Sequence, residues 1–346
     1  MNIPSRRLPA KSRLSLLLLL LAGGCAQRGP VAEPPPALKR PPVAAPGVAL
    51  GKEYVVVTAT PRDTFQSLAS QYLGDRNKDW QIADFNKSER AVPGQKIVIP
   101  LVHPNPVGVY PDGYQTVPIL CYHRFGNKRD RMVVTPEAFA AQMTYLRDNG
   151  YRVIPLSSLP AFLNGEAPLP KRSVVITIDD GYQSSHDIAY PILRKFGFPA
   201  TIFIYSDFMN ARDAMDWDEM RQMAASGLID FQPHSKTHPH MADRQPRESP
   251  EAYQARIEEE IRVPGQKIRQ QLGLPLYSFA YPYGETNDLV IAELRKGNYQ
   301  LGTTVRVGGN PAFSYPFRLR RTMIFGDRDM DSFVRALEVF SPVTLR

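Results

Sequence analysis

Ser173-Val-Val-Ile-Thr-Ile-Asp179-Asp180-Gly181 is the segment that best indicates the fold class of this 346-residue chain. Its five apolar or β-branched residues predict a buried strand, which ends on two adjacent carboxylates and a glycine. Two neighbouring carboxylates repel each other and lose hydration when they are buried, so we expect a positive group close by. His234-Ser-Lys-Thr-His238 begins 54 residues after Asp180 and offers two imidazoles. One aspartate and two histidines can form a three-ligand metal site with an open position, which leaves the other aspartate free to act as a base.

Strand and helix patterns alternate on both sides of this segment. Strands are predicted at Val117–His123, Tyr151–Ile154, Val174–Ile178, Ala200–Tyr205, Ile229–Gln232, Tyr277–Ala280, Tyr299–Thr304 and Leu319–Ile324. One helix is predicted to begin at Thr135-Pro136, and glycines mark the predicted helix ends at Gly150, Gly197, Gly227 and Gly297. Apolar strands that alternate with helices favour an α/β fold with parallel strands covered by helices. With about seven such strands, a barrel is favoured over an open sheet.

The candidate catalytic residues stand where such a barrel would carry its chemistry. Asp179, His123, His234 and Tyr283 lie at or just beyond the carboxyl ends of four different predicted strands. Active sites of (β/α) barrels are built at that face, from the ends of several strands. We therefore expect these residues to meet in space.

A metal site would divide the work of the two aspartates. Asp180, His234 and His238 suit Zn²⁺ or a similar divalent ion, because imidazole and carboxylate are zinc ligands. Water bound to such an ion has its pKa lowered to about 7. Asp179 would then accept the proton of that water. A backbone N–H of the turn Tyr281-Pro-Tyr283-Gly284 would stabilise the oxyanion that develops.

Residues 1–25 resemble a bacterial lipoprotein signal. Four basic residues precede the apolar run Leu14–Leu21, and Ala22-Gly-Gly-Cys25 is similar to a lipobox. We expect export, lipidation of Cys25 and an anchor in the cell envelope, on the periplasmic face of the outer membrane. The formal charge of the chain is +8, and removal of the four basic residues would leave +4, which is too weak to indicate nucleic acid as a partner. Cys121, the other cysteine, lies in an apolar strand and is predicted to be a core residue.

Two linkers are predicted from composition. Residues 26–51 hold seven prolines and are expected to form a semi-rigid tether without a core. Residues 102–114 are expected to be a second, shorter linker. Between them, residues 52–101 carry the pattern of a compact unit with the order strand, helix, helix, strand.

That small unit resembles a LysM domain. Asp63-Thr64 follows the first strand, Asn86 ends the second helix, and Pro93-Gly-Gln precedes the second strand, as in that family. The unit departs from the family pattern at Arg62, where glycine is usual. The resemblance implies binding of glycans that contain N-acetylglucosamine, such as peptidoglycan.

Three motifs of the longer C-terminal part resemble those of the polysaccharide deacetylases, carbohydrate esterase family four, also called the NodB-homology domain. They are Thr177-Ile-Asp-Asp-Gly181, His234-Ser-Lys-Thr-His238 and Phe279-Ala-Tyr-Pro-Tyr-Gly284. The resemblance spans about residues 115–325, inside a predicted domain over 115–346. It implies a distorted (β/α) barrel and an enzyme that removes acetyl groups from glycans.

The resemblance also implies a role for each motif residue. Asp179 would be the general base, and Tyr283 would contribute its backbone N–H to the oxyanion hole. A divalent metal, Zn²⁺ or an ion such as Co²⁺ or Ni²⁺, would be held by Asp180, His234 and His238.

The chain departs from the common family pattern at two places. Ala280 stands where many members have an arginine that pairs with the catalytic aspartate, and no histidine follows His240 to protonate the leaving amine. The branch that acts on poly-N-acetylglucosamine has similar features, including an early Tyr-His. His123 is therefore the candidate for the acid or for a substrate contact. Trp217 and Tyr281 are predicted to contact the sugar.

The leading functional hypothesis is a metal-dependent deacetylase of the cell envelope. Its substrate would be a glycan that contains N-acetylglucosamine, either an exopolysaccharide or peptidoglycan. One alternative is a wall-binding lipoprotein, held by the LysM-like unit, whose barrel is catalytically weak or inactive. Another is a glycosidase that uses Asp179 and Asp180 as its carboxylate pair, although sequence neighbours are poorly placed to flank one bond from opposite sides.

Overall fold

The computed structural model describes residues 48–128 and 130–343. The chain separates into two units, residues 1–44 and 45–346, and the described residues all belong to the second. The predicted signal, with Cys25, and most of the first predicted linker lie outside the described residues. No described helix combines the length and the apolar character that are needed to cross a membrane.

Residues 48–100 form a small antiparallel sheet in the order β1-β2-β3, with two helices between β2 and β3. The elements are β1 (Val48–Leu50), β2 (Tyr54–Thr58), α1 (Phe65–Leu73), the 3₁₀ turn η1 (Arg76–Lys78), α2 (Asp79–Asn86) and β3 (Lys96–Pro100). The predicted order of strand, helix, helix and strand is confirmed. The prediction that the linker extends to residue 51 is wrong, because β1 already pairs with β2.

Local hydrogen bonds explain where the helices of this unit begin and end. The Thr64 side chain accepts from the Ser67 N–H and caps α1, and Gly74 ends that helix in the left-handed conformation. The Asn86 amide donates to Val98 O at 2.6 Å and accepts from Val98 N–H at 2.9 Å, which ties α2 to β3. The likeness of this unit to a LysM domain stays a prediction.

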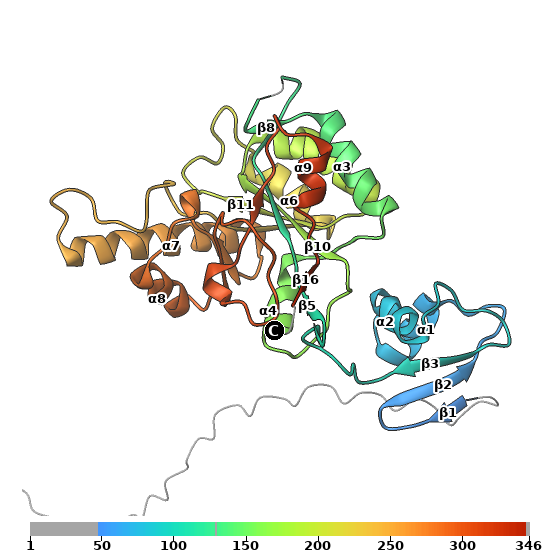
Figure 1. Ribbon diagram of the computed structural model, residues 1–346. Coiled ribbons are helices and arrows are strands. Elements are labelled where there is room, and N and C mark those ends of the chain that lie inside the picture. The colour runs from blue at the N-terminus through green and yellow to red at the C-terminus, as the bar shows by residue number, and fades with distance from the viewer. Residues whose placement is uncertain (1–47, 129, 344–346) are drawn as a thin grey trace, which may run out of the picture. The chain divides into compact units, whose positions relative to one another are not determined.

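The longer part of the described chain is built on a parallel sheet in the order β12-β11-β10-β6-β15. Figure 1 labels β10 and β11 of this sheet. Its strands are β6 (Ile119–Tyr122), β10 (Ser173–Asp180), β11 (Ala200–Ile204), β12 (Ile229–Pro233) and β15 (Thr322–Met323), with β9 (Arg152–Val153) paired to the start of β10. A separate parallel pair consists of β13 (Ser278–Ala280) and β14 (Leu301–Thr303). The eight predicted strands are therefore confirmed, with shifts at their ends. Every residue of β10 is buried, as expected of a central parallel strand.

The predicted barrel is only partly correct, because the strand ladder does not close. Between β12 and β13 the buried side chain of Gln232 takes the place of backbone pairing. Its amide oxygen accepts from the Tyr277 and Ser278 N–H groups at 3.1 Å, and its amide nitrogen donates to Pro275 O at 2.9 Å. On the other side of the pair, a single bridge from Thr303 reaches the segment that leads to β15. The strands thus approach closure but leave one seam that a side chain fills.

Helices cover the sheet. They are α3 (Pro136–Asp148), α4 (Leu159–Leu163), α5 (Tyr190–Phe196), α6 (Trp217–Ala225), α7 (Pro250–Leu272), α8 (Asp288–Lys296) and α9 (Met330–Arg335). All of those named here except α4 and α5 begin at a side-chain cap. Short turns are η2 (Leu156–Ser158), the π-helical η3 (Ser185–Ala189), η4 (Pro282–Gly284) and η5 (Pro316–Arg318). Thr135 caps α3 and Asp216 caps α6 through side-chain bonds to backbone N–H groups. The main hydrophobic core lies where α3, α5, α6, α9 and the end of α7 meet β6, β10, β11 and β12.

Short strands at the margin of this fold correct one predicted domain boundary. β4 (Val109–Tyr110) and β5 (Gly113–Gln115) form a hairpin, and β16 (Phe340–Pro342) pairs with β5. A further parallel pair consists of β7 (Arg124–Phe125) and β8 (Val133–Val134). Residues 102–114 are therefore not a plain linker, because the hairpin within them belongs to a sheet shared with the last strand.

Candidate metal centre

Asp180, His234 and His238 converge at the carboxyl edge of the parallel sheet. Asp180 is the last residue of β10, and the two histidines come from the loop that follows β12. Asp180 Oδ1 lies 3.6 Å from His234 Nε2 and 3.5 Å from His238 Nε2. One ligand atom from each residue fits within a span of 4.8 Å. The three residues are therefore close enough to share one ion.

The surroundings of the two histidines leave their Nε2 atoms available as ligands. The Nδ1 of His234 lies 2.8 Å from Ala280 O, so this ring nitrogen donates and Nε2 keeps its lone pair. Burial lowers the pKa of His234 to about 3 and also lowers the pKa of His238. Both rings are thus neutral, which is the form that binds metal. Two neutral imidazoles and a carboxylate fit Zn²⁺ or a related divalent ion.

Backbone strain is concentrated at this site. Asp180, Ser235, His238 and Tyr283 have φ values of 77°, 77°, 61° and 59°. They are four of the eight non-glycine residues with positive φ in the described part of the chain. Residues in this region are uncommon and gather at functional sites, where the surrounding structure holds them.

Asp179 is buried and is paired with Arg321. The guanidinium donates to the two carboxylate oxygens at 2.6 and 2.7 Å, and both side chains are buried. Arg321 also donates to Thr177 Oγ1 at 3.2 Å and to Thr304 O at 3.0 Å. Burial would raise the pKa of Asp179, but Arg321, then His234, hold it well below its usual range. Asp179 is therefore ionised at neutral pH.

This pairing corrects an expectation from the sequence. Ala280 replaces the arginine that is common in the third motif, so the motifs alone name no positive partner for Asp179. Arg321 supplies the missing charge from just before β15, and Ala280 serves instead through its carbonyl, which orients His234. A charged residue inside the predicted strand Leu319–Ile324 was the available signal, because a buried strand rarely carries arginine without a partner.

Asp180 has a different electrostatic environment from its neighbour. Burial raises the pKa of Asp180 to about 6, and Asp179 acts in the same direction. His123, Arg124 and Tyr182 act in the opposite direction. Asp179 has a positive partner in Arg321. A metal ion bound beside Asp180 would be the corresponding positive partner of Asp180.

His123 and Tyr283 both lie at the edge of the cluster, as predicted. His123, Cys121 and Asp179 bring one potential ligand atom each within 4.8 Å of the others. Tyr283 is half exposed, and its ring lies edge-on to His238 at 4.8 Å. The ring of His240 stacks on Tyr283 at 4.1 Å and an interplanar angle of 13°. No motif in the sequence connects His240 with the site.

The two residues predicted to contact the sugar, Tyr281 and Trp217, do not belong to the cluster around Asp180. The side chain of Tyr281 is fully buried, and its hydroxyl donates to Phe317 O at 2.9 Å. The prediction that Tyr281 binds substrate is therefore wrong, because the side chain is part of the core. Trp217 begins α6 and is partly buried against the main core. Its role as a sugar contact stays a prediction.

Aromatic rings extend from the cluster across the surface. Tyr205 lies 5.2 Å from His238 and stacks on Phe208, which in turn contacts Tyr182. On the other side, Tyr283 borders a cavity of about 380 Å³ that is also lined by Arg306 and other polar residues. A sugar has apolar C–H faces and polar hydroxyl groups. Flat aromatic rings can pack against the faces, and the polar groups beside them can hydrogen-bond to the hydroxyls.

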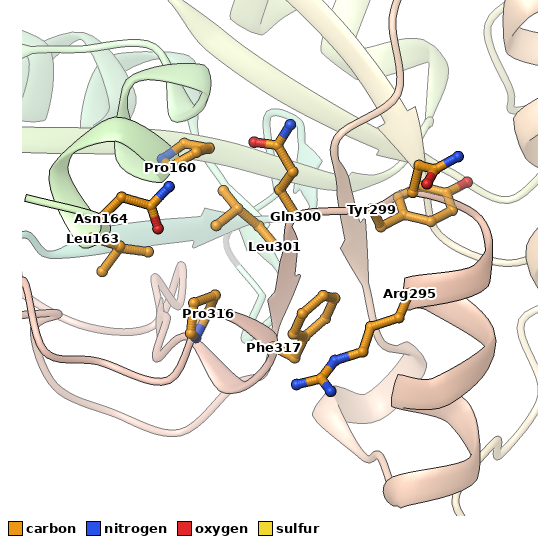
Figure 2. Close-up of a pocket in the computed structure, with 10 residues that line it drawn as sticks. Pro160, Leu163, Asn164, Arg295, Tyr299, Gln300, Leu301, Pro316 and Phe317 are labelled. Carbon is orange, nitrogen blue, oxygen red and sulfur yellow. The ribbon is translucent and has the colours of Figure 1, made fainter. Parts of the chain in front are cut away.

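A cavity of about 530 Å³ lies elsewhere on the domain (Figure 2). Its walls include Leu163, Leu301, Phe317 and Arg295, and Leu301 is the first residue of β14. This cavity is separate from the cluster of Asp180, His234 and His238. None of the predicted site residues lines it.

Comparisons with known proteins agree with this geometry. Residues 166–302 match the family model "Polysaccharide deacetylase", and the matched segment contains all three motifs. The Bacillus subtilis protein YxkH is 27% identical over 208 residues, which are 60% of this chain and 71% of YxkH. The poly-β-1,6-N-acetyl-D-glucosamine N-deacetylase of Escherichia coli is 26% identical over 211 residues, which are 51% of this chain but only 31% of that enzyme.

A solved structure extends the likeness to the fold. The structure of IcaB from Ammonifex degensii matches 65% of this chain and 97% of its own, with a TM-score of 0.57 and 27% identity. The family model, the relatives and this fold support a polysaccharide deacetylase domain and a hydrolase that acts on carbon–nitrogen bonds. Arg321, the partner of Asp179, lies outside the segment that matches the family model.

Proposed function

We propose that this protein is a metal-dependent deacetylase that hydrolyses the N-acetyl groups of a glycan containing N-acetylglucosamine. The observation that carries the proposal is the division between the two aspartates. Asp179 is ionised and held by Arg321, while Asp180 faces His234 and His238 and forms no ion pair with a lysine or arginine among the described residues. That arrangement is what a base beside a metal site requires.

The proposed metal ligands are Asp180, His234 and His238, and the donor set suits Zn²⁺, Co²⁺ or Ni²⁺. When bound, such an ion supplies Lewis acidity, which activates water and polarises an amide carbonyl. Asp179 takes a proton from the attacking water. The proton that Asp179 accepts would then pass to the nitrogen of the leaving amine. The carbon–nitrogen bond breaks, and acetate and a free amine result.

Two further residues have proposed roles in the same reaction. Tyr283 would donate its backbone N–H to the oxyanion, from a turn in which the Gly284 N–H is already used by Tyr281 O at 2.8 Å. His123 lies on the Asp179 side of the cluster and would contact the leaving amine or donate a proton to it. A His123→Ala variant that releases acetate as fast as wild type would remove His123 from the mechanism.

The proposed substrate class is a polymer rather than a single sugar. The relatives from Escherichia coli and Staphylococcus epidermidis are named for poly-β-1,6-N-acetyl-D-glucosamine. The rings of Tyr205 and Tyr283 and the cavity beside Tyr283 would bind sugars on either side of the one that reacts. Trp217 would extend this surface.

We also propose how the enzyme is kept near its substrate. The LysM-like unit would bind peptidoglycan or a related glycan, and lipidated Cys25 would anchor the exported protein to the envelope, on the periplasmic face of the outer membrane. Deletion of residues 48–101 should reduce binding to insoluble glycan while acetate release from soluble oligomers persists. Equal retention of the two forms on peptidoglycan would contradict this role.

Acetate release from N-acetylglucosamine oligomers, with and without a chelator, tests the proposed reaction. We expect release that stops with the chelator, returns with added metal and is absent in Asp180→Ala. Full activity of that variant would overturn the metal assignment. Binding to glycan without acetate release would favour the wall-binding alternative, and cleavage of the chain that ignores the chelator would favour a glycosidase.

A further inference from the structure

The loop between the two histidine ligands rests on a buried carboxylate of α7. Glu260 Oε2 accepts from the Lys236 N–H at 2.8 Å and from the Thr237 N–H at 2.9 Å. Glu260 Oε1 accepts from the Thr237 hydroxyl at 2.7 Å. Glu260 is only 5% exposed, although it belongs to a helix whose neighbouring residues Glu258 and Glu259 face solvent.

The partners of this carboxylate come from the loop itself. Lys236 directs its ammonium group to Asp207 and Glu259, at 3.5 and 3.3 Å, and offers Glu260 only its backbone N–H. A buried carboxylate is costly unless hydrogen bonds satisfy it. Glu260 therefore depends on the loop in one conformation, and the loop depends on Glu260.

The loop needs such support because its backbone is strained at both ends. Ser235 and His238 have φ values of 77° and 61°, a region that non-glycine residues rarely adopt. The two N–H groups between them point at one oxygen of Glu260, which fixes the direction of the turn. That direction sets where His234 and His238 present their Nε2 atoms to Asp180.

We propose that Glu260 is a positioning residue that holds the His234 and His238 ligands in place for metal binding. It does not contact the ion and takes no part in the chemistry. The inference rests on the proposed metal site, and it adds a residue from α7 that none of the three motifs contains. Groups behind metal ligands typically change metal affinity about 10- to 100-fold when they are removed.

The test is a titration of the full chain with Co²⁺ alone, followed by the visible absorption of the bound ion. We expect Glu260→Ala to weaken Co²⁺ binding about 10- to 100-fold and to change the absorption spectrum. Glu260→Gln should retain most of the affinity, because its amide oxygen still accepts from the N–H groups and its amide nitrogen can donate to the Thr237 hydroxyl. Glu258→Gln, on the exposed face of the same helix, should bind Co²⁺ like wild type.

Several outcomes separate this inference from the function on which it rests. Co²⁺ binding is measured below the melting temperature of every variant. If Glu260 has a purely structural role, its replacement lowers stability but leaves the Co²⁺ dissociation constant unchanged. That result would overturn the inference. If Glu260→Ala does not fold, Thr237→Val removes one of the three bonds from an exposed side chain, and unchanged Co²⁺ affinity there overturns it as well. A wild type that binds Co²⁺ but releases no acetate contradicts the proposed reaction and leaves the role of Glu260 intact.

Discussion

The two sides of the candidate site are held by different kinds of interaction. On one side, Asp179 is held by the side chain of Arg321, in an ion pair that is buried in the core. On the other, His234 and His238 are held through a strained loop whose backbone N–H groups bond to Ser235 and Glu260. A buried ion pair is part of the stability of the fold, whereas a supported loop mainly sets geometry. Damage to the first side should therefore appear as unfolding, and damage to the second as lost metal affinity.

The largest effect is expected when Arg321 is replaced by methionine. Arg321→Met leaves the Asp179 charge buried without a partner, which typically costs about 3–5 kcal/mol of unfolding free energy. Denaturant unfolding measures the loss, and Arg320→Met, at the exposed neighbour, should change stability by less than about 0.5 kcal/mol. The double variant with Asp179→Asn should recover part of the loss, because the unpaired charge is gone. Equal stabilities of Arg321→Met and wild type would show that the ion pair does not hold this side.

Asp179→Asn should affect catalysis far more than metal binding. General-base catalysis contributes about 10²- to 10⁴-fold, and we expect acetate release to fall by that factor. Co²⁺ affinity should stay close to wild type, since Asp180 and the two histidines are unchanged. If Co²⁺ affinity falls together with acetate release, Asp179 is itself a metal ligand. The distinction between the two sides of the site would then be wrong.

Ser235→Ala should produce a smaller effect on the histidine side. Ser235 Oγ accepts from the His238 N–H at 2.8 Å, and a bond of this kind contributes about 1 kcal/mol. We expect Co²⁺ affinity to fall about fivefold, the equivalent of that energy. Ser235→Gly loses the same bond but adopts a positive φ more easily, so it should be the more stable of the two variants. An affinity unchanged in both would leave Glu260 as the main support of the loop.

Much of this fold, and the histidine side of the candidate site, follow from short sequence patterns. The strands and the helix start at Thr135 each depend on residues a few positions apart, and the structure confirms them. The cluster of Asp180 with two histidines was predicted from two short motifs at strand ends, and the structure brings them together. The ion pair of Asp179 joins residues 142 positions apart, so no local pattern marks it. Tyr281 was misjudged because a short turn does not reveal which of its rings faces inward.

The seam of the barrel was missed for a similar reason. Gln232 ends an apolar stretch and resembles an ordinary strand residue, yet its side chain takes over pairing with residues 277 and 278. Glu260 was missed because α7 carries three consecutive glutamates. Which of them is buried depends on how the helix is rotated about its axis relative to the loop that follows β12. Long-range partners of charged and amide groups are therefore what the sequence left open.

Cys121→Ser should give the smallest effect of these variants. It tests whether any group besides Arg321 holds Asp179 in position. Cys121 is buried with its Sγ 3.4 Å from Asp179 Oδ2, and burial raises the pKa of the thiol well above its ordinary value. The thiol is therefore not a nucleophile at neutral pH, and the serine hydroxyl can donate to the same oxygen. We expect a change of about 1 kcal/mol in unfolding free energy and acetate release close to wild type. A loss as large as that of Asp179→Asn would mean that Arg321 alone does not hold the carboxylate, and that the small group behind it also sets its position.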